Sequence, residues 1–103
     1  MNPYTVLIAP RARAQIERLD AWWRENRPGA ASRFVDELKA TIGRLGAMPL
    51  TGPLYERPGA PANVRQLLMP RSRYHVFYLV ESESRIVTLQ AVWHATRGKG
   101  PAL

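Results

Sequence analysis

Three apolar runs, rich in β-branched and aromatic residues, follow one another near the end of the chain. They are residues 64–69, 74–80 and 86–93. Runs of this length and composition are typical of β-strands. The four or five residues between them are enough only for hairpin connections, so consecutive strands should pair antiparallel. The sequence therefore predicts a three-stranded antiparallel meander, with 74–80 in its centre because that run has almost no polar alternation.

The first half of the chain begins with a predicted strand and a predicted helix. Residues 4–9 are apolar and β-branched, which indicates a strand covered on both faces. Pro10 then suits the first turn of a helix, where its missing N–H costs nothing. A helix that runs to about Asn26 would gather four apolar side chains into one buried stripe. These are Ala12, Ile16, Leu19 and Trp23.

A second helix is predicted from Pro28 to about Leu45, and one of its sides is apolar. Because only a few residues separate the two helices, we expect them to pack as an antiparallel hairpin. Gly46 is expected to end the second helix with a left-handed cap. The following stretch to Pro61 is rich in proline and glycine, which predicts an irregular surface connection.

These elements fit one α+β domain spanning residues 1–103. The helix hairpin should pack on one face of the sheet, and the first strand should join the sheet at one edge. No apolar run approaches the ~20 residues needed to cross a bilayer, and no signal-peptide pattern is present. The chain has no cysteine, and its histidines are separated, so neither a metal site nor a cofactor is expected. A soluble cytoplasmic protein with no membrane partner is the simplest fit.

Positive charge without nearby acid distinguishes the second half of the chain. The formal net charge is +7, and no Asp or Glu occurs between Glu56 and Glu81 or after Glu83. A sheet that carries mainly cations is expected to meet something anionic, either nucleic acid or an acidic protein. A compositional preference for arginine, or charge that protects a sheet edge from aggregation, would be the simpler explanations. The cations are Arg57, Arg65, Arg71, Arg73, Arg85, Arg97 and Lys99.

Two further residues are candidates for function. Trp22 should lie at the flank of the first helix, beside Arg11 and Arg18, where an exposed tryptophan could anchor a protein partner. A partly buried residue at the rim of the core would show the same pattern. His94 follows the last apolar run and could act as a general acid or base near neutral pH. A lone histidine at a strand end is more often a surface or hydrogen-bonding residue.

Several short motifs occur along the chain in a fixed order. They are residues 4–10 before the helices, FVDEL at 34–38, MPLTG at 48–52, VRQLL at 64–68, YHVFY at 74–78 and VWHATR at 92–97. Together with the order of the elements, this set resembles the RelE/ParE superfamily of bacterial toxins from type II toxin–antitoxin systems. The resemblance extends over almost the whole chain, and it implies the α+β fold described above.

The resemblance implies activity against one of two targets. RelE-like members cleave mRNA on the ribosome without a metal, by driving a ribose 2′-OH onto the adjacent phosphate. In this chain Glu56 or His94 would then exchange the proton as the catalytic residue, while arginines hold the phosphate. ParE-like members instead poison DNA gyrase through a protein contact. The candidate residues for contact with phosphate or target are Arg65, Arg71, Arg73, Arg97 and Lys99.

Two departures from the RelE pattern favour a ParE-like toxin. That pattern is rich in lysine, whereas this chain has only Lys39 and Lys99. Ala95 follows His94, at the position where some ribonuclease members have a tyrosine. We therefore predict a toxin that inhibits growth by poisoning gyrase and is not an enzyme. The alternatives are a metal-independent, ribosome-dependent mRNA endoribonuclease and a non-toxic interaction or nucleic-acid-binding module.

The resemblance also implies a cognate antitoxin with an acidic, partly disordered tail. Family antitoxins fold this tail into a helix and a strand over the toxin's helix hairpin and sheet edge. In this chain the predicted antitoxin contacts are Trp22, Arg11 and Arg18. An outer strand of the sheet could accept the added strand.

Overall fold

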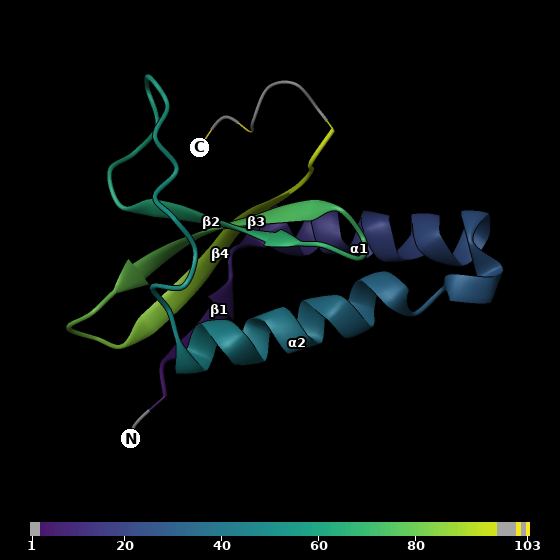
Figure 1. Cartoon of the computed structure of the whole chain (residues 1–103), viewed down its shortest axis with the longest axis horizontal. Helices are drawn as coiled ribbons and strands as arrows, with labels where there is room; N and C mark the ends of the chain where they lie inside the picture. Colours follow the sequence, from purple (N-terminus) through teal and green to yellow (C-terminus); the bar gives the residue numbers. More distant parts are fainter. Residues whose placement is uncertain (1–2, 97–100, 102) are drawn as a thin grey trace.

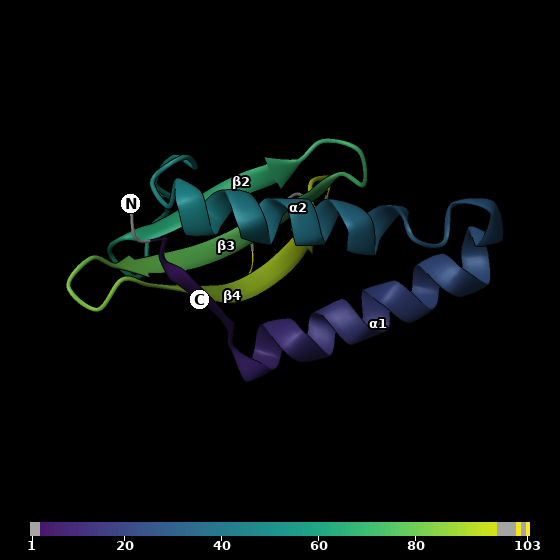
Figure 2. The same cartoon turned by 90° about the horizontal axis from the view of Figure 1, so that it is seen from below.

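The computed structural model describes residues 3–96, 101 and 103 as a four-stranded sheet with two helices. Both helices pack against the same core (Figure 1), α2 across one face of the sheet and α1 alongside β4 (Figure 2). The α+β class, the N-terminal strand, the helix hairpin and the meander are therefore as predicted. The elements are β1 (Thr5–Ile8), α1 (Pro10–Asn26), the 3-10 turn η1 (Pro28–Ala30), α2 (Arg33–Ala47), β2 (Val64–Met69), β3 (Tyr74–Glu81) and β4 (Ile86–His94).

The sheet is mixed, with strand order β1-β4-β3-β2. β2, β3 and β4 pair antiparallel, whereas β1 pairs parallel to β4, from Thr5 with Ile86 to Ile8 with Leu89. The connection permits this parallel pair, since the helix hairpin, β2 and β3 lie between β1 and β4 along the chain. β1 thus occupies one edge of the sheet, as predicted, and β2 the other.

One extra residue in β4 changes which side chains face the helices. Phe77 pairs with Ala91, but the next residue, Tyr78, pairs with Leu89, so Gln90 is left over as a β-bulge. Before the bulge, Val87 and Leu89 belong to the core shared with the helices, and after it Val92 does. The bulge therefore shifts the alternation by one residue and directs the end of β4 toward α1.

The main core lies between the helices and the sheet, and the apolar stripe predicted on the first helix contributes to it. Trp23 is buried, and its Nε1 donates a hydrogen bond to the hydroxyl of Tyr74 at 3.3 Å. Phe34 of α2 packs edge-to-face on the same tyrosine, with ring centroids 5.2 Å apart. Neither helix in the described part of the chain has the length and apolar content needed to cross a bilayer.

A second, smaller cluster covers the opposite face of the sheet. Its buried members are Val64, Phe77 and Ala91, and Tyr55 and Leu103 pack on them from outside the sheet. The connection between α2 and β2 rises on the side away from α2 (Figure 1). β3 is thus covered on both faces, as its continuous apolar sequence predicts.

Two details of the first half differ from the prediction. β1 is covered on one face only, because Thr5 and Leu7 are exposed while Val6 and Ile8 are half-buried. The second cluster involves β2, β3 and β4, so the outer face of β1 remains open to solvent. The second helix does not run unbroken from Pro28, since the 3-10 turn precedes α2, which begins at Arg33.

The predicted left-handed cap at Gly46 is also wrong. α2 continues through Gly46 to Ala47, and Gly46 is not among the residues with positive φ. Its carbonyl instead accepts a hydrogen bond from the N–H of Tyr4 at 2.8 Å. A Cβ at Gly46 would lie 3.2 Å from the carbonyl oxygen of Tyr4. The glycine therefore lets the start of β1 approach the last turn of α2.

Candidate functional site

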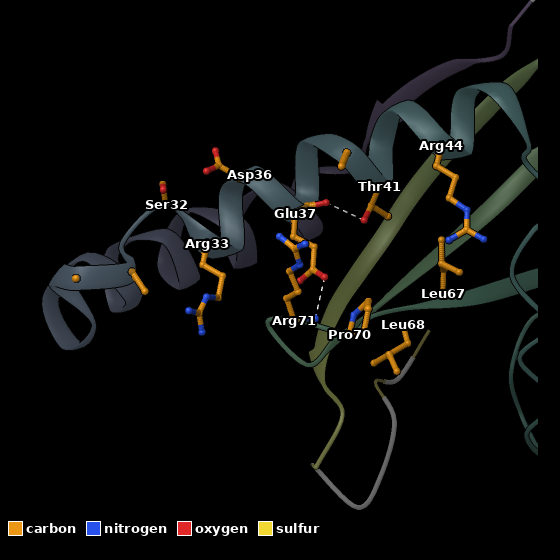
Figure 3. A pocket seen from close by; sticks show the side chains of 13 residues that line it. Ser32, Arg33, Asp36, Glu37, Thr41, Arg44, Leu67, Leu68, Pro70 and Arg71 are labelled. Atoms are coloured by element: carbon orange, nitrogen blue, oxygen red, sulfur yellow. Dashed lines mark hydrogen bonds between the residues drawn. The ribbon is translucent and has the colours of Figure 1, made fainter.

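A pocket of about 630 Å³ lies between α2 and the second half of β2. Leu67 and Leu68 give it an apolar side, and Leu68 is 41% exposed. Figure 3 shows Arg33 and Arg44 extending from α2 and Arg71 lying near Glu37. We call this pocket the α2–β2 groove; its described lining combines apolar surface with three guanidinium groups and the carboxylates of Asp36 and Glu37.

Glu37 ties the turn between β2 and β3 to α2 (Figure 3). Its carboxylate accepts hydrogen bonds from the N–H of Arg71 at 2.8 Å and from both the N–H and the hydroxyl of Ser72 at 2.7 Å. Burial alone would raise the pKa of Glu37, but these hydrogen bonds and the charge of Arg71 outweigh it and lower the pKa below its ordinary value. The charged carboxylate therefore holds the β2–β3 turn, which forms one wall of the groove, against α2.

The outer edge of β2 is covered along its first half only. The N–H of Tyr55 donates to the carbonyl of Val64 at 2.7 Å, and the N–H of Gln66 donates to the carbonyl of Pro53 at 3.0 Å. Within the described ranges, no backbone group continues this pairing to Leu68. The open part of the edge thus borders the α2–β2 groove, where an extended peptide could add as a strand.

The structure separates arginines that the sequence analysis grouped together. Arg65 donates to the carbonyl of Gly52 at 2.8 Å, so it holds the connection against β2. Arg71 and Arg73 lie in the turn at the other end of that strand, roughly 20 Å away. These three cations therefore lie at opposite ends of one strand, and their role as target contacts stays a prediction.

A second pocket, of about 350 Å³, lies between α1 and the end of β4. It brings His94 together with Arg18 and Trp22, which were predicted to lie side by side on the first helix. Arg11 is exposed in the first turn of α1 and does not line this pocket. We call this site the α1–β4 pocket; its remaining lining is Gln15, Leu19, Tyr74, Val92 and Trp93.

His94 has a defined ring orientation. Its Nδ1 accepts a hydrogen bond from the N–H of Thr96 at 3.2 Å and lies 2.6 Å from the Thr96 hydroxyl oxygen. The imidazole also packs edge-to-face on Tyr74, with ring centroids 5.1 Å apart. Because a backbone N–H donates to Nδ1, the neutral ring carries its proton on Nε2.

Glu56 and His94, the two alternative residues predicted to exchange the proton, do not meet. Glu56 follows Tyr55, which is bonded to the first residue of β2, whereas His94 pairs with Tyr74 at the far end of the sheet. Five strand residues, or roughly 17 Å, separate these positions. Arg97 and Lys99 lie outside the described residues. Within the described part of the chain, no three side chains of the metal-binding types gather.

Several residues that organise these sites were not among the predicted site residues, although each lies in one of the quoted motifs. Glu37, in the FVDEL motif, holds the turn that carries Arg71. Gly52 donates its N–H to the buried hydroxyl of Tyr78 at 2.9 Å. Gly52 lies in the MPLTG motif and Tyr78 in the YHVFY motif, so the two motifs marked both residues in the sequence. That the two residues contact each other follows only from the fold.

Similar solved structures are toxins and toxin–antitoxin systems. The chromosomal ParDE system of P. aeruginosa has a TM-score of 0.69 at 15% identity, covering 88% of this chain and 95% of that one. The RelBE2 toxin–antitoxin complex of Mycobacterium tuberculosis has a TM-score of 0.63 at 24% identity, covering 91% and 93%. A mutant of the E. coli toxin RelE in the free state has a TM-score of 0.60 at 18% identity, covering 93% and 87%.

Comparison by sequence identifies the family. No curated protein sequence matches the chain. A sequence model of the ParE toxin of the type II toxin–antitoxin system ParDE matches residues 6–98. That match includes every helix and all of the sheet except the first residue of β1. The chain therefore belongs to the ParE toxin family of type II toxin–antitoxin systems.

Proposed function

We propose that this toxin arrests bacterial growth by poisoning DNA gyrase through a protein contact. The observation that carries the proposal is the family match over residues 6–98, because gyrase is the target that the resemblance implies for ParE-like members. A toxin of this kind needs a stable surface that fits its target and no catalytic group.

The geometry of the predicted catalytic residues also supports gyrase poisoning over RNA cleavage. RNA cleavage through the 2′-OH needs a base, an acid and cations within hydrogen-bond reach of one phosphate. Here Glu56 and His94 lie at opposite ends of the sheet, and Arg65 is engaged with the carbonyl of Gly52. These described residues could not serve one phosphate together.

We further propose that an acidic antitoxin tail neutralises the toxin at the α2–β2 groove. Two of the similar structures are described as toxin–antitoxin systems, which supports such a partner. The groove offers exposed Leu68 beside an open strand edge, with Arg33 and Arg71 around it. A disordered acidic segment could order there as an added strand, with its carboxylates near the guanidinium groups.

The test is a gyrase assay run beside a translation-coupled mRNA cleavage assay. Purified toxin should inhibit supercoiling of plasmid DNA by gyrase, or trap cleaved plasmid, while mRNA on translating ribosomes stays intact. The same toxin after heat unfolding is the control for non-specific binding of a cationic chain to DNA. Gyrase that works normally in the presence of folded toxin, together with cleaved mRNA, would overturn the proposal in favour of the ribonuclease.

A further inference from the structure

Exposed apolar side chains are concentrated at the start of the connection between α2 and β2. Met48, Leu50 and Leu54 are three of the six large apolar side chains that are exposed in the described part of the chain. Leu50 is the most exposed of the six, at 61%. A single exposed apolar side chain needs no explanation, whereas a group of them typically marks a site of protein contact. We call these three residues the 48–54 patch.

The backbone that carries the 48–54 patch is held in place from both sides. The N–H of Thr51 donates to the carbonyl of Met48 at 3.2 Å, which closes a turn. The Arg44 guanidinium of α2 donates to the Thr51 hydroxyl at 3.0 Å. Arg65 of β2 donates to the carbonyl of Gly52 at 2.8 Å. A segment that is already fixed in the free protein loses little conformational entropy on binding, so this apolar surface is suited to a partner.

A pocket of about 200 Å³ lies within the patch, between the connection and the end of β3. Leu50, Leu54 and Val80 give it apolar walls, and no Asp or Glu belongs to its described lining. The carbonyl groups to which Arg65 donates are neutral, so its charge still favours an anionic partner. A partner that fits would insert an apolar side chain and carry carboxylates nearby. The remaining lining residues are Asn63, Arg65 and Ser82.

The backbone beside the patch excludes a partner that adds as a strand. The outer edge of β2 is already paired here, because the connection bonds to Val64 and Gln66. Leu54 also forms an antiparallel bridge with Arg65. The patch therefore offers side chains rather than free backbone groups, which suits the surface of a folded protein. A second copy of this chain fits poorly, because its net charge of +7 would bring further cations to Arg65.

We propose that the 48–54 patch is the surface through which the toxin contacts gyrase, with Leu50 and Leu54 receiving an apolar side chain from a folded, acidic part of the enzyme. This assignment rests on the proposed function, which requires a protein contact and leaves its place on the toxin open.

The patch continues the α2–β2 groove along the same strand. Arg65 and Leu67 are two residues apart on β2, so their side chains share one face of the sheet. Arg44 lines the groove and also donates to Thr51. An antitoxin segment in the groove would therefore lie beside the patch and obstruct the approach of a large enzyme. Neutralisation then needs no antitoxin residue in the patch itself.

The experiment measures the toxin concentration that halves the supercoiling of relaxed plasmid by intact gyrase. We expect the double variant Leu50→Ala and Leu54→Ala to require about tenfold more toxin than the parent, because truncation removes the central apolar contact. Leu7→Ala is the matched control, since it truncates an exposed leucine of β1 outside the patch and should inhibit like the parent. Thermal unfolding of each variant checks that it is folded.

A pair of substitutions at Ser82 tests whether the partner is acidic. Ser82 is exposed and lines the pocket, so Ser82→Glu should raise the half-inhibiting concentration about tenfold through like-charge repulsion, whereas Ser82→Lys should not raise it. The control is Ser84→Glu, which adds the same charge at an exposed position of the same turn that does not line the pocket.

The outcomes separate this proposal from the proposed function. If the parent inhibits gyrase and the leucine double variant inhibits it equally well, the 48–54 patch is not the contact surface, although the proposed function stands. Equal effects of Ser82→Glu and Ser82→Lys would exclude an acidic partner. Weaker binding of the leucine double variant to plasmid alone, measured by gel shift, would show that the patch contacts DNA instead. A parent toxin that leaves gyrase active would overturn the proposed function and this assignment together.

Discussion

At Gly52 the backbone is enclosed by two strands. Its N–H donates to the hydroxyl of Tyr78, and its carbonyl accepts from Arg65. A Cβ at this position would lie 2.3 Å from the carbonyl oxygen of Gln66 and 2.7 Å from the Tyr78 hydroxyl. Tyr78 is fully buried, so its hydroxyl depends on this partner. These contacts fix the connection against the sheet.

We expect Gly52→Ala to lower the free energy of unfolding by about 3 kcal/mol, because the added methyl group must displace β2 backbone. Chemical denaturation followed by circular dichroism measures the change. Gly43→Ala is the matched control, since nothing lies within 4 Å of a Cβ there and alanine favours a helix by up to about 1 kcal/mol. Equal stability of Gly52→Ala and the parent would show that the connection does not pack as described.

Glu37 should make stability depend on pH. Because its folded-state pKa lies below the ordinary value of 4.5, its contribution is complete above that value and is lost as the pH falls through the lower folded pKa. We expect Glu37→Gln to lower the free energy of unfolding at pH 7 by about 1 kcal/mol, a modest cost because the site is half-exposed. Below the folded pKa of Glu37, the free energies of unfolding of the variant and the parent should become equal.

The control for this prediction is Asp36→Asn, which removes the adjacent exposed carboxylate of α2. Urea denaturation at a series of pH values compares the three proteins. If the free energy of unfolding of Glu37→Gln depends on pH in the same way as that of the parent, the charged Glu37 carboxylate does not hold the β2–β3 turn.

At the scale of the elements, local pattern predicted most of the fold. The sequence shows the apolar run of β3 and the helical stripe ending at Trp23, because the burial of each segment is encoded in its own pattern of apolar residues. The exposed face of β1, the role of Gly46 and the bulge at Gln90 could not be predicted. Each of these depends on which distant segment packs nearby, and a local pattern does not carry that information.

The edge of β2 should show two levels of protection against hydrogen exchange. The N–H of Gln66 is bonded to Pro53, so its exchange should be slow, whereas the N–H of Leu68 lies on the same open side of the strand and should exchange faster. NMR-detected exchange into D₂O measures both amides in one protein. Saturating the toxin with its antitoxin should slow Leu68 selectively, if the tail adds to this edge as proposed. Equal protection in the free toxin would contradict an open edge.

For the whole molecule, the cations form separate groups. Arg65 binds the connection, while Arg33 and Arg71 border the α2–β2 groove and Arg18 lines the α1–β4 pocket. The sequence predicted the excess of positive charge and the separate candidates Arg18, Trp22 and His94. It did not predict that His94 shares one pocket with Arg18 and Trp22, because His94 lies more than 70 residues beyond them along the chain. Strand pairing and the bulge at Gln90 bring them together.

This distribution of charge should control how fast an acidic antitoxin associates. We expect the double variant Arg33→Gln and Arg71→Gln to slow association about tenfold at low salt, with less effect on dissociation. The matched control is Arg13→Gln with Arg27→Gln, which removes the same charge from exposed positions that do not line the groove. In stopped-flow kinetics, the association rates of the groove double variant and the parent should become equal as the salt concentration rises, because screening removes the attraction. Equal slowing by both double variants would mean that net charge alone sets the rate and that the α2–β2 groove has no special part in it.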